Sequence, residues 1–251
     1  ERASAVGVPV HLLPLGRLRR SPRAPLDWLG GARAVAARAQ EVGARLLVAN
    51  GVRAALYTAP AACLARTPIV WYLRDFWLSE SRPKHLWADR LIKRSLCAVA
   101  ARVIANSQAT AGHLPRSRKV VVIHNGIDLR HFAPSQDGLR FRQEHGIPPQ
   151  ARVLGTVGRL RPWKGQELFL RALSPLAAQS PEVRLVIAGG ADPAVDDGYA
   201  ERLRQVASKL GLAEQAVFAG HLEDVRPALA AMDVFVHPGE PEPFGLVNVE
   251  A

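Results

Sequence analysis

Residues 237–251 (HPGEPEPFGLVNVEA) combine acidic side chains, glycines and prolines in a pattern suited to binding a phosphorylated ligand. They follow a short apolar stretch and pass through a turn into a helix that we expect to begin near Phe244. A helix N-terminus presents unpaired N–H groups, and Gly245 lets a phosphate approach the backbone closely. Glu250 on the helix can accept hydrogen bonds from a ribose, and Glu242 in the turn can accept them from a sugar.

The segment GRLRPWKG at 158–165 supplies the positive charge that a diphosphate beside two carboxylates requires. It follows the apolar stretch 152–157, so we expect Arg159 and Lys164 at the end of a buried strand. Arginine offers a planar fork of donors and lysine a point charge, and fixed cations of this kind stabilise a departing diphosphate. Arg161 is expected to lie in solvent.

Short apolar stretches alternate with longer helical segments from residue 45 onward, which is typical of parallel sheets covered on both faces by helices. The expected strands are 45–49, 69–73, 102–105, 119–123, 152–157, 183–188, 216–219 and 233–236. The expected helices are 52–65, 84–100, 107–114, 164–174, 199–210 and 223–231. Pro175 is expected to kink or stop the helix that precedes it.

These elements predict an α/β protein built from two Rossmann-like, doubly wound parallel-sheet domains. Ligands bind such sheets at the carboxyl ends of the strands, so the expected site is a cleft where the two sets of ends face each other. Prolines and glycines gather between residues 132 and 150, which favours a domain junction there. We place the two domains at 1–135 and 136–251.

Positive charge is concentrated in the first half of the chain. Residues 1–120 carry 20 basic and 6 acidic side chains, whereas residues 121–251 carry 13 basic and 16 acidic ones. The densest cluster comprises Arg17, Arg19, Arg20 and Arg23. This excess fits an anionic membrane surface or another anionic acceptor, and a solvated arginine-rich face explains it equally well. Nucleic acid is disfavoured because zinc-finger spacing, an aromatic RNA-binding strand and a basic heptad are all missing.

Composition narrows the class of protein further. With 48 % apolar and 22 % charged residues, the chain has the balance of an ordinary globular protein, which excludes disordered, collagen-like and disulfide-rich classes. Cys63 and Cys97 belong to no CxxC motif or cysteine–histidine cluster, which predicts reduced, buried thiols in a cytoplasmic protein. No apolar run reaches the ~18 residues that span a bilayer, so membrane contact would be peripheral, at the inner face.

Five motifs occur in the order and spacing of a known family. They are NGID (125–128), GRLRPWKG (158–165), LVIAGG (185–190), VFAGHLEDV (217–225) and EPFGLVNVE (242–250). Together they make residues 120–251 resemble the GT-B glycosyltransferases of family 4, which transfer sugars from nucleotide donors. The resemblance implies transfer of a hexosyl group from a UDP- or GDP-sugar to a glycan, lipid-linked or small-molecule acceptor, with retention and without a metal or other cofactor. The absence of a D-x-D triplet fits a metal-independent reaction.

The resemblance also assigns residues. Arg159 and Lys164 would hold the donor diphosphate, Glu242 would lie by the transferred sugar as a catalytic residue, and Glu250 would bind the ribose. The donor-binding set is completed by the backbone N–H groups of Phe244, Gly245 and Leu246 at the phosphates, and by His221 and Leu222 at the base. This makes 136–251 the donor-binding domain.

The first half resembles the acceptor-side domain of the family less specifically, through residues 67–77 and 101–110. Many members carry His-Asp near the transferred sugar. Here Arg74 precedes Asp75, so Asp75 is a second candidate catalytic residue whose role the resemblance leaves open. Both domains would be incomplete relative to the family, and the fragment as given would then be inactive by itself.

Two other readings stay open from the residues. A non-catalytic nucleotide-sugar-binding homologue or partner subunit is favoured by the missing histidine before Asp75. A Rossmann-type NAD protein is disfavoured because no G-x-G-x-x-G follows a first strand. His237, at the end of a strand, is as easily a satisfied core histidine as a member of the site.

Overall fold

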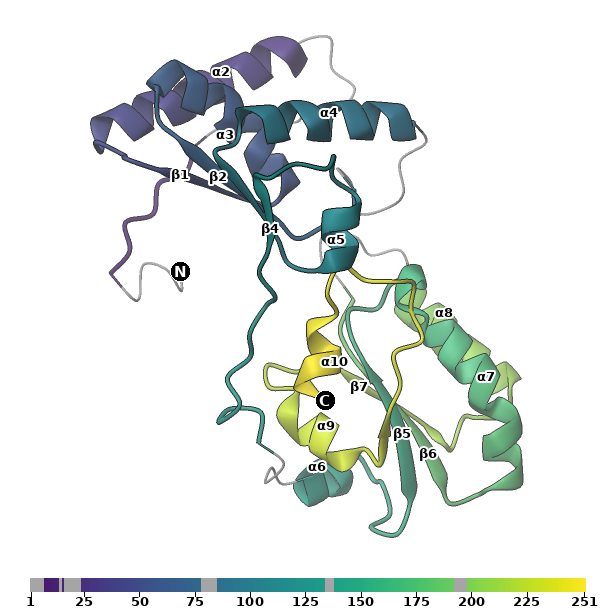
Figure 1. The fold of residues 1–251 in the computed structure, drawn as a ribbon. Coiled ribbons are helices and arrows are strands. Elements are labelled where there is room, and N and C mark those ends of the chain that lie inside the picture. The colour runs from purple at the N-terminus through teal and green to yellow at the C-terminus, as the bar shows by residue number, and fades with distance from the viewer. Residues whose placement is uncertain (1–6, 14, 16–23, 78–84, 134–137, 192–197) are drawn as a thin grey trace. The chain divides into compact units, whose positions relative to one another are not determined.

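The computed structural model describes residues 7–13, 15, 24–77, 85–133, 138–191 and 198–251 (Figure 1). The chain divides into two compact units, unit 1 (Glu1–Asn125) and unit 2 (Gly126–Ala251). The domain boundary expected after residue 135 and the arginine cluster within residues 17–23 both lie outside the described residues. In the described part of the chain, no helix combines the length and apolar character needed to cross a membrane.

Unit 1 is built on a parallel sheet with strand order β1-β2-β3-β4. Its strands are β1 (Leu47–Asn50), β2 (Ile69–Leu73), β3 (Arg102–Ala105) and β4 (Val120–Val122). Its helices are α2 (Ala24–Glu41), α3 (Val52–Ala65), α4 (Leu86–Val99) and α5 (Gln108–Gly112). Helix α2 has no counterpart among the expected elements, because it buries mainly alanine and glycine and so lacks a strong apolar stripe.

The core of unit 1 lies between the sheet and helices α3 and α4. Ala49, Trp71 and Val103 are register partners on adjacent strands and are almost fully buried against these helices. On the opposite face of the sheet, Val48 and Val121 are exposed, so this face is only partly covered in the described residues. Cover of this second face is therefore not tested by the described residues.

The two cysteines differ in environment. Cys97 on α4 is buried in the core, and this burial raises the pKa of its thiol to about 11. Cys63 on α3 is exposed, so the expectation of two buried thiols was wrong for this residue. It lies near the end of α3, outside the stripe of small residues that faces the sheet.

Unit 2 is built on a second parallel sheet with strand order β7-β6-β5-β8. Its strands are β5 (Arg152–Val157), β6 (Val183–Ala188), β7 (Ala216–Gly220) and β8 (Val234–Phe235). Its helices are α6 (Gly138–Glu144), α7 (Gln166–Gln179), α8 (Tyr199–Lys209), α9 (Arg226–Ala231) and α10 (Leu246–Glu250), with a 3-10 turn η1 (Pro162–Lys164) before α7.

Both faces of the second sheet are covered, as expected of a doubly wound domain. Leu185 and Ile187 of β6 pack in one core cluster with residues of α7 and α8. Val186 and Ala188 of the same strand point the other way, into a cluster with residues of α6 and α9. Alternate residues of one strand thus face two helical layers.

Helix α7 continues through Pro175, so of the two expected outcomes, a kink or a stop, the stop is wrong. A proline cannot donate the backbone hydrogen bond to the carbonyl four residues earlier, here that of Arg171. The hydroxyl of Ser174 donates to this carbonyl instead, over 3.0 Å. The local substitution lets the helix run five residues beyond the end expected from the sequence.

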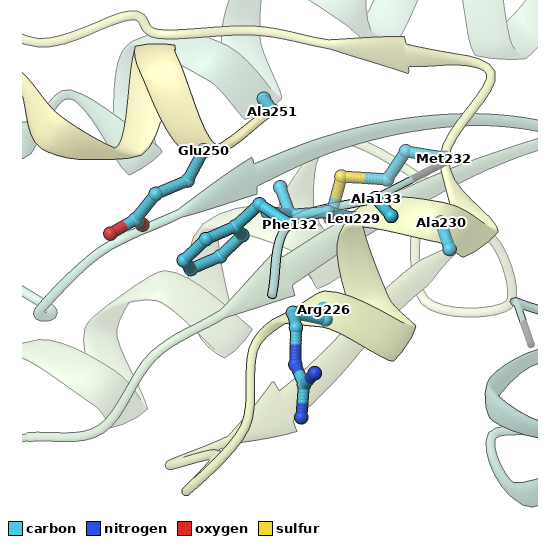
Figure 2. Close-up of a pocket in the computed structure, with 8 residues that line it drawn as sticks. All are labelled: Phe132, Ala133, Arg226, Leu229, Ala230, Met232, Glu250 and Ala251. Atoms are coloured by element: carbon cyan, nitrogen blue, oxygen red, sulfur yellow. The ribbon is translucent and has the colours of Figure 1, made fainter. Parts of the chain in front are cut away.

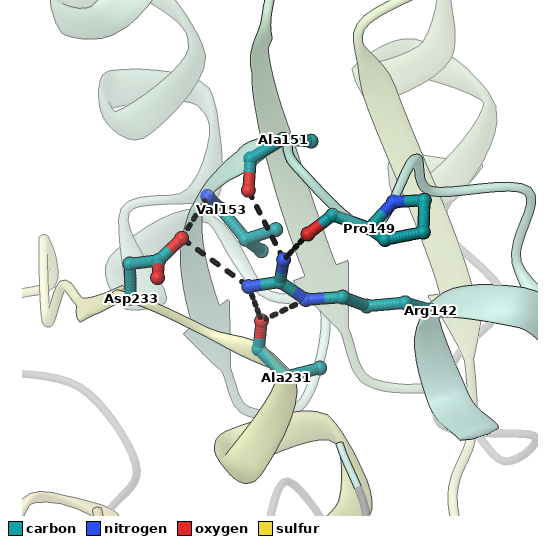
Figure 3. A network of polar contacts seen from close by, with 6 residues as sticks. All are labelled: Arg142, Pro149, Ala151, Val153, Ala231 and Asp233. Carbon is teal, nitrogen blue, oxygen red and sulfur yellow. Dashed lines mark hydrogen bonds and ion pairs between the residues drawn. The ribbon is translucent and has the colours of Figure 1, made fainter. Parts of the chain in front are cut away.

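Arg142 ties helix α6 to the sheet of unit 2 (Figure 3). Its guanidinium donates to the carbonyls of Pro149 (2.9 Å), Ala151 (3.1 Å) and Ala231 (2.8 and 3.0 Å). It also contacts the carboxylate of Asp233 at 3.2 Å, and that carboxylate accepts from the N–H of Val153 at 2.7 Å. One largely buried side chain therefore links α6, the start of β5, the end of α9 and the residue before β8.

We expect the substitution Arg142→Met to lower the free energy of unfolding by about 3 kcal/mol, because it leaves buried carbonyls without donors. Arg140→Met is the matched control, since Arg140 lies on the same helix and pairs with Glu144 while 77 % exposed. Its effect should stay near 0.5 kcal/mol. Urea denaturation of both variants measures the difference, and equal losses would show that the Arg142 contacts add nothing.

Candidate functional site

Glycines bring the carboxyl ends of three strands of unit 2 into backbone contact. The N–H of Gly189, after β6, donates to the carbonyl of Gly220 at the end of β7, over 2.8 Å. A Cβ on Gly189 would lie 1.9 Å from the carbonyl oxygen of Gly158, after β5. A Cβ on Gly190 would lie 2.8 Å from the Cβ of His221. No larger residue fits at these positions, so the loops after the three strands meet at one edge of the sheet.

The loop at 158–165 also packs directly on the turn at 237–243. Gly165 has a φ of +75° at the N-cap of α7, and a Cβ there would lie 2.4 Å from the carbonyl oxygen of Pro238. The N–H of Glu240 donates to the carbonyl of Trp163 over 2.9 Å. Two motifs almost eighty residues apart in the sequence thus form one surface.

Glu242 is the centre of the polar contacts on this surface. Its Oε1 atom accepts from Nζ of Lys164 in an ion pair and lies 2.9 Å from Nε2 of His237. The side chains of all three residues are only 21 % exposed. The sequence predicted Lys164 and Glu242 as members of one site, and the structure places them in direct contact.

The electrostatics keep Glu242 ionised. Burial alone would raise the pKa of this carboxyl, but the hydrogen bonds from Lys164 and His237 and their charges outweigh burial and lower it below its usual range. An ionised glutamate accepts hydrogen bonds and donates none. The site therefore presents a carboxylate that suits the hydroxyls of a ligand.

The backbone of Arg159, rather than its side chain, forms the contact that fixes this residue. Its carbonyl accepts from Nε2 of Gln166, a residue that is almost fully buried at the start of α7. In the described part of the chain the exposed guanidinium of Arg159 forms no ion pair, so it is available to a ligand. Sequence reasoning missed Gln166, and only its position directly after the glycine at 165 hinted at it.

Arg161 was expected in solvent, and this expectation was wrong. The residue is only 5 % exposed, and its guanidinium lies 5.9 Å from the centre of the Trp163 ring. The flat, delocalised cation packs on the indole and so tolerates burial.

Glu250 lies at the end of α10 beside a small cavity of about 240 Å³ (Figure 2). The cavity is lined by Phe132, Ala133, Arg226, Leu229, Ala230, Met232, Glu250 and Ala251. Burial raises the pKa of the Glu250 carboxyl. Neither Lys164 nor Glu242 lines this cavity, so the predicted ribose-binding glutamate has surroundings different from those of the other carboxylate.

The remaining predicted donor-binding residues lie around the same loops. Helix α10 begins at Leu246 rather than at Phe244, because Gly245 adopts a φ of +74° and forms the N-cap. His221 is exposed and lies against Gly190, whereas Leu222 is half-buried and packs on the cluster formed with α6 and α9. Their roles toward a ligand stay predictions.

In unit 1, Asp75 follows β2 at the carboxyl edge of the first sheet. Its Oδ2 atom lies 3.8 Å from the position of a Cβ on Gly51, the N-cap of α3. The guanidinium of Arg74 lies 5.9 Å from the centre of the Tyr72 ring. The Tyr72 hydroxyl donates to Oδ1 of Asn125 over 2.6 Å, which gives the first residue of the NGID motif a structural contact.

Two family models match the chain. Residues 1–131 match Glycosyltransferase Family 4, and residues 138–251 match Glycosyl transferases group 1. The chain belongs to glycosyltransferase family 4. Both matches agree with the family resemblance found in the sequence.

Curated relatives of family 4 differ in what they act on. The chain is 31 % identical over 192 residues to the lipopolysaccharide core biosynthesis mannosyltransferase LpsB of Rhizobium meliloti, covering 76 % of this chain and 52 % of the relative. It is 37 % identical over 163 residues to D-inositol 3-phosphate glycosyltransferase 2 of Catenulispora acidiphila, covering 61 % and 38 %. The chain thus spans about half the length, or less, of these relatives.

Similarity to solved structures confirms the GT-B fold. Anabaena HepE in complex with UDP gives a TM-score of 0.81 at 30 % identity, covering all of this chain and 66 % of HepE. HepE in complex with UDP-glucose gives a TM-score of 0.78 at 31 % identity, with the same coverage. The sucrose-phosphate synthase of Thermosynechococcus elongatus, at 23 % identity and a TM-score of 0.77, supports the fold alone.

Proposed function

We propose that this family 4 protein transfers a hexosyl group from a UDP- or GDP-sugar to a glycan, lipid-linked or small-molecule acceptor, with retention. In this proposal residues 136–251 bind the donor and residues 1–135 the acceptor. The observation that carries it is the contact of Lys164 and His237 with Glu242, on a surface formed by two donor-side motifs. The complexes of HepE with UDP and UDP-glucose support the class of donor.

We assign each side chain of the proposed donor site a role according to its charge. Lys164 and Arg159 stabilise the negative charge that grows on the diphosphate as the bond to the sugar breaks. Glu242, kept ionised by its two partners, accepts hydrogen bonds from the sugar hydroxyls. Donor binding then moves Lys164 from the carboxylate to a phosphate, while His237 keeps its contact with Glu242.

Calorimetry with UDP-glucose and GDP-mannose tests the donor site in the intact protein. We expect Lys164→Met to weaken binding of the preferred donor at least tenfold, because a charge-assisted hydrogen bond is worth about 1.5–3 kcal/mol. Lys209→Met, an exposed lysine on α8, is the control and should leave affinity unchanged. Unchanged affinity in Lys164→Met would contradict the assignment.

A release assay for free nucleoside diphosphate separates the proposal from its main alternative. A transferase releases the diphosphate when an acceptor or water receives the sugar. A non-catalytic homologue or partner subunit binds the donor and releases none. The arginine at position 74, where many relatives carry histidine, is the feature that favours the alternative.

We also propose that the protein works in the cytoplasm and meets an anionic membrane surface through helix α4. Trp87 and Leu91 are exposed on this helix, and the exposed Arg90 and Arg94 lie beside them. A face with an aromatic side chain and cations suits the interface of anionic lipids. The excess of basic residues in 1–120 agrees with this surface.

Sedimentation with phosphatidylglycerol vesicles at low salt tests the membrane contact. We expect the double variant Arg90→Gln/Arg94→Gln to bind at least tenfold more weakly, since each cation near such a surface contributes about 1 kcal/mol. The control Arg202→Gln/Arg204→Gln removes two exposed arginines from α8 and should bind as the parent does. Equal recovery with neutral phosphatidylcholine vesicles would refute the contact.

A further inference from the structure

Unit 1 contains a buried ion pair that the proposed mechanism does not use. Lys93 and Asp89 lie one turn apart on α4, with Nζ and Oδ2 2.8 Å apart. Their side chains are 0 % and 3 % exposed, which makes Lys93 one of the largest fully buried side chains in the described residues. Burying two charges costs solvation free energy, and their mutual attraction offsets little more than this cost.

The ammonium group of Lys93 also contacts the loop that follows β2. Its Nζ donates to the carbonyl of Phe76 and lies 5.2 Å from the centre of the Trp77 ring. The ring of His113, at the C-cap of α5, stacks on Phe76 with centroids 4.7 Å apart and meets Trp77 edge-on at 4.6 Å. One buried cation therefore fixes both the backbone and the aromatic side chains of this loop.

The surroundings of His113 disfavour a second positive charge in the cluster. Burial first, and the Lys93 charge second, lower the pKa of His113. Asp89 supplies the countercharge, as the one carboxylate among the groups that shift His113.

An apolar pair at these positions would hold α4 against the core equally well. It could not donate to the Phe76 carbonyl. The specific effect of Lys93 is therefore on the loop, and Phe76 directly follows Asp75, the candidate catalytic residue of unit 1 whose role the family resemblance leaves open.

We propose that Lys93, held in place by Asp89, is a positioning residue that fixes the loop at 74–77 and so keeps the Asp75 carboxylate at the carboxyl edge of the sheet. The inference rests on the proposed function, because it gives Asp75 a role in transfer. It adds a residue that no motif of the sequence marks.

The test compares two variants of the intact protein that both perturb α4. Asp89→Asn/Lys93→Met removes both charges and the donor to Phe76 at nearly constant volume. Leu96→Ala opens a cavity in the core beside the same helix without touching the loop. We expect the double variant to lower kcat per folded molecule about tenfold or more, with donor affinity unchanged. Leu96→Ala should lower stability and leave kcat per folded molecule unchanged.

Two further variants separate the possible failures. Asp89→Asn alone keeps an amide oxygen that accepts from Nζ of Lys93, so the contact with Phe76 persists and kcat should fall less than in the double variant. Asp75→Asn should lower kcat at least as far as the double variant does. If Asp75→Asn is impaired and the double variant is not, positioning by Lys93 is wrong while the proposed function stands. If Asp75→Asn is fully active, the role of Asp75 in the proposed function is wrong, and the inference falls with it.

Discussion

Glu242→Gln is expected to lower kcat by about a hundredfold or more, the largest effect of any single substitution proposed for this protein. The amide has the size of the carboxylate and still offers an acceptor oxygen, but it has no charge, so Lys164 and His237 lose their shared anionic partner. The sugar hydroxyls lose the ionised acceptor that these partners maintain. Release of nucleoside diphosphate, measured under saturating donor in the full-length protein, gives kcat directly.

Glu240→Gln is the matched control for this experiment. Glu240 lies in the same turn and is exposed, and its known contact is made by its backbone N–H rather than its carboxylate. Its substitution should leave kcat within about twofold, as expected for a surface charge away from the reacting atoms. If the two glutamines have equal effects, the ion pair with Lys164 is incidental to transfer.

Gly165→Ala is expected to cost about 3 kcal/mol of unfolding free energy and to weaken donor binding as well. An alanine at a φ of +75° is strained by about 1 kcal/mol, and its Cβ would stand 2.4 Å from the Pro238 carbonyl oxygen. Backbone on both sides must move, which separates Lys164 from Glu242. Denaturation and donor calorimetry on the same preparation measure the two effects together.

Gly198→Ala isolates the contribution of backbone strain. Gly198 is also a helix N-cap, with a φ of +67°, but a Cβ there would meet nothing within 4 Å among the residues that the structure describes. This variant should lose about 1 kcal/mol of stability and bind the donor normally. If both variants lost the same free energy of unfolding, the close packing of the two loops would not contribute to stability.

Most strands and helices were predictable from the sequence, because the residue patterns that predict them are local. Apolar strands such as 69–73 and 183–188 have the same bounds in the structure, since buried parallel strands read as continuous runs of Val, Ile and Leu. The contact of Lys164 with Glu242 also followed, because residues after neighbouring parallel strands must share one edge of a sheet.

The errors concern side-chain contacts that composition and periodicity do not specify. Arg161 is buried and lies against the Trp163 ring, and no charge pattern reveals this. Pro175 is accommodated by the hydroxyl of its neighbour Ser174. The proposed role of Lys93 depends on its contact with Phe76, 17 residues earlier in the chain, and no local pattern in the sequence connects the two residues.

The ion pair between Lys164 and Glu242 has a consequence for selectivity. In the free protein the cation is already neutralised, so sulfate or inorganic phosphate must compete with an internal carboxylate for it. In the proposed donor site, a ligand that carries a sugar would offer hydroxyls to the carboxylate as its phosphate binds the lysine. Small anions offer no such hydroxyls, so the proposal predicts that they bind this site more weakly than the sugar donor does.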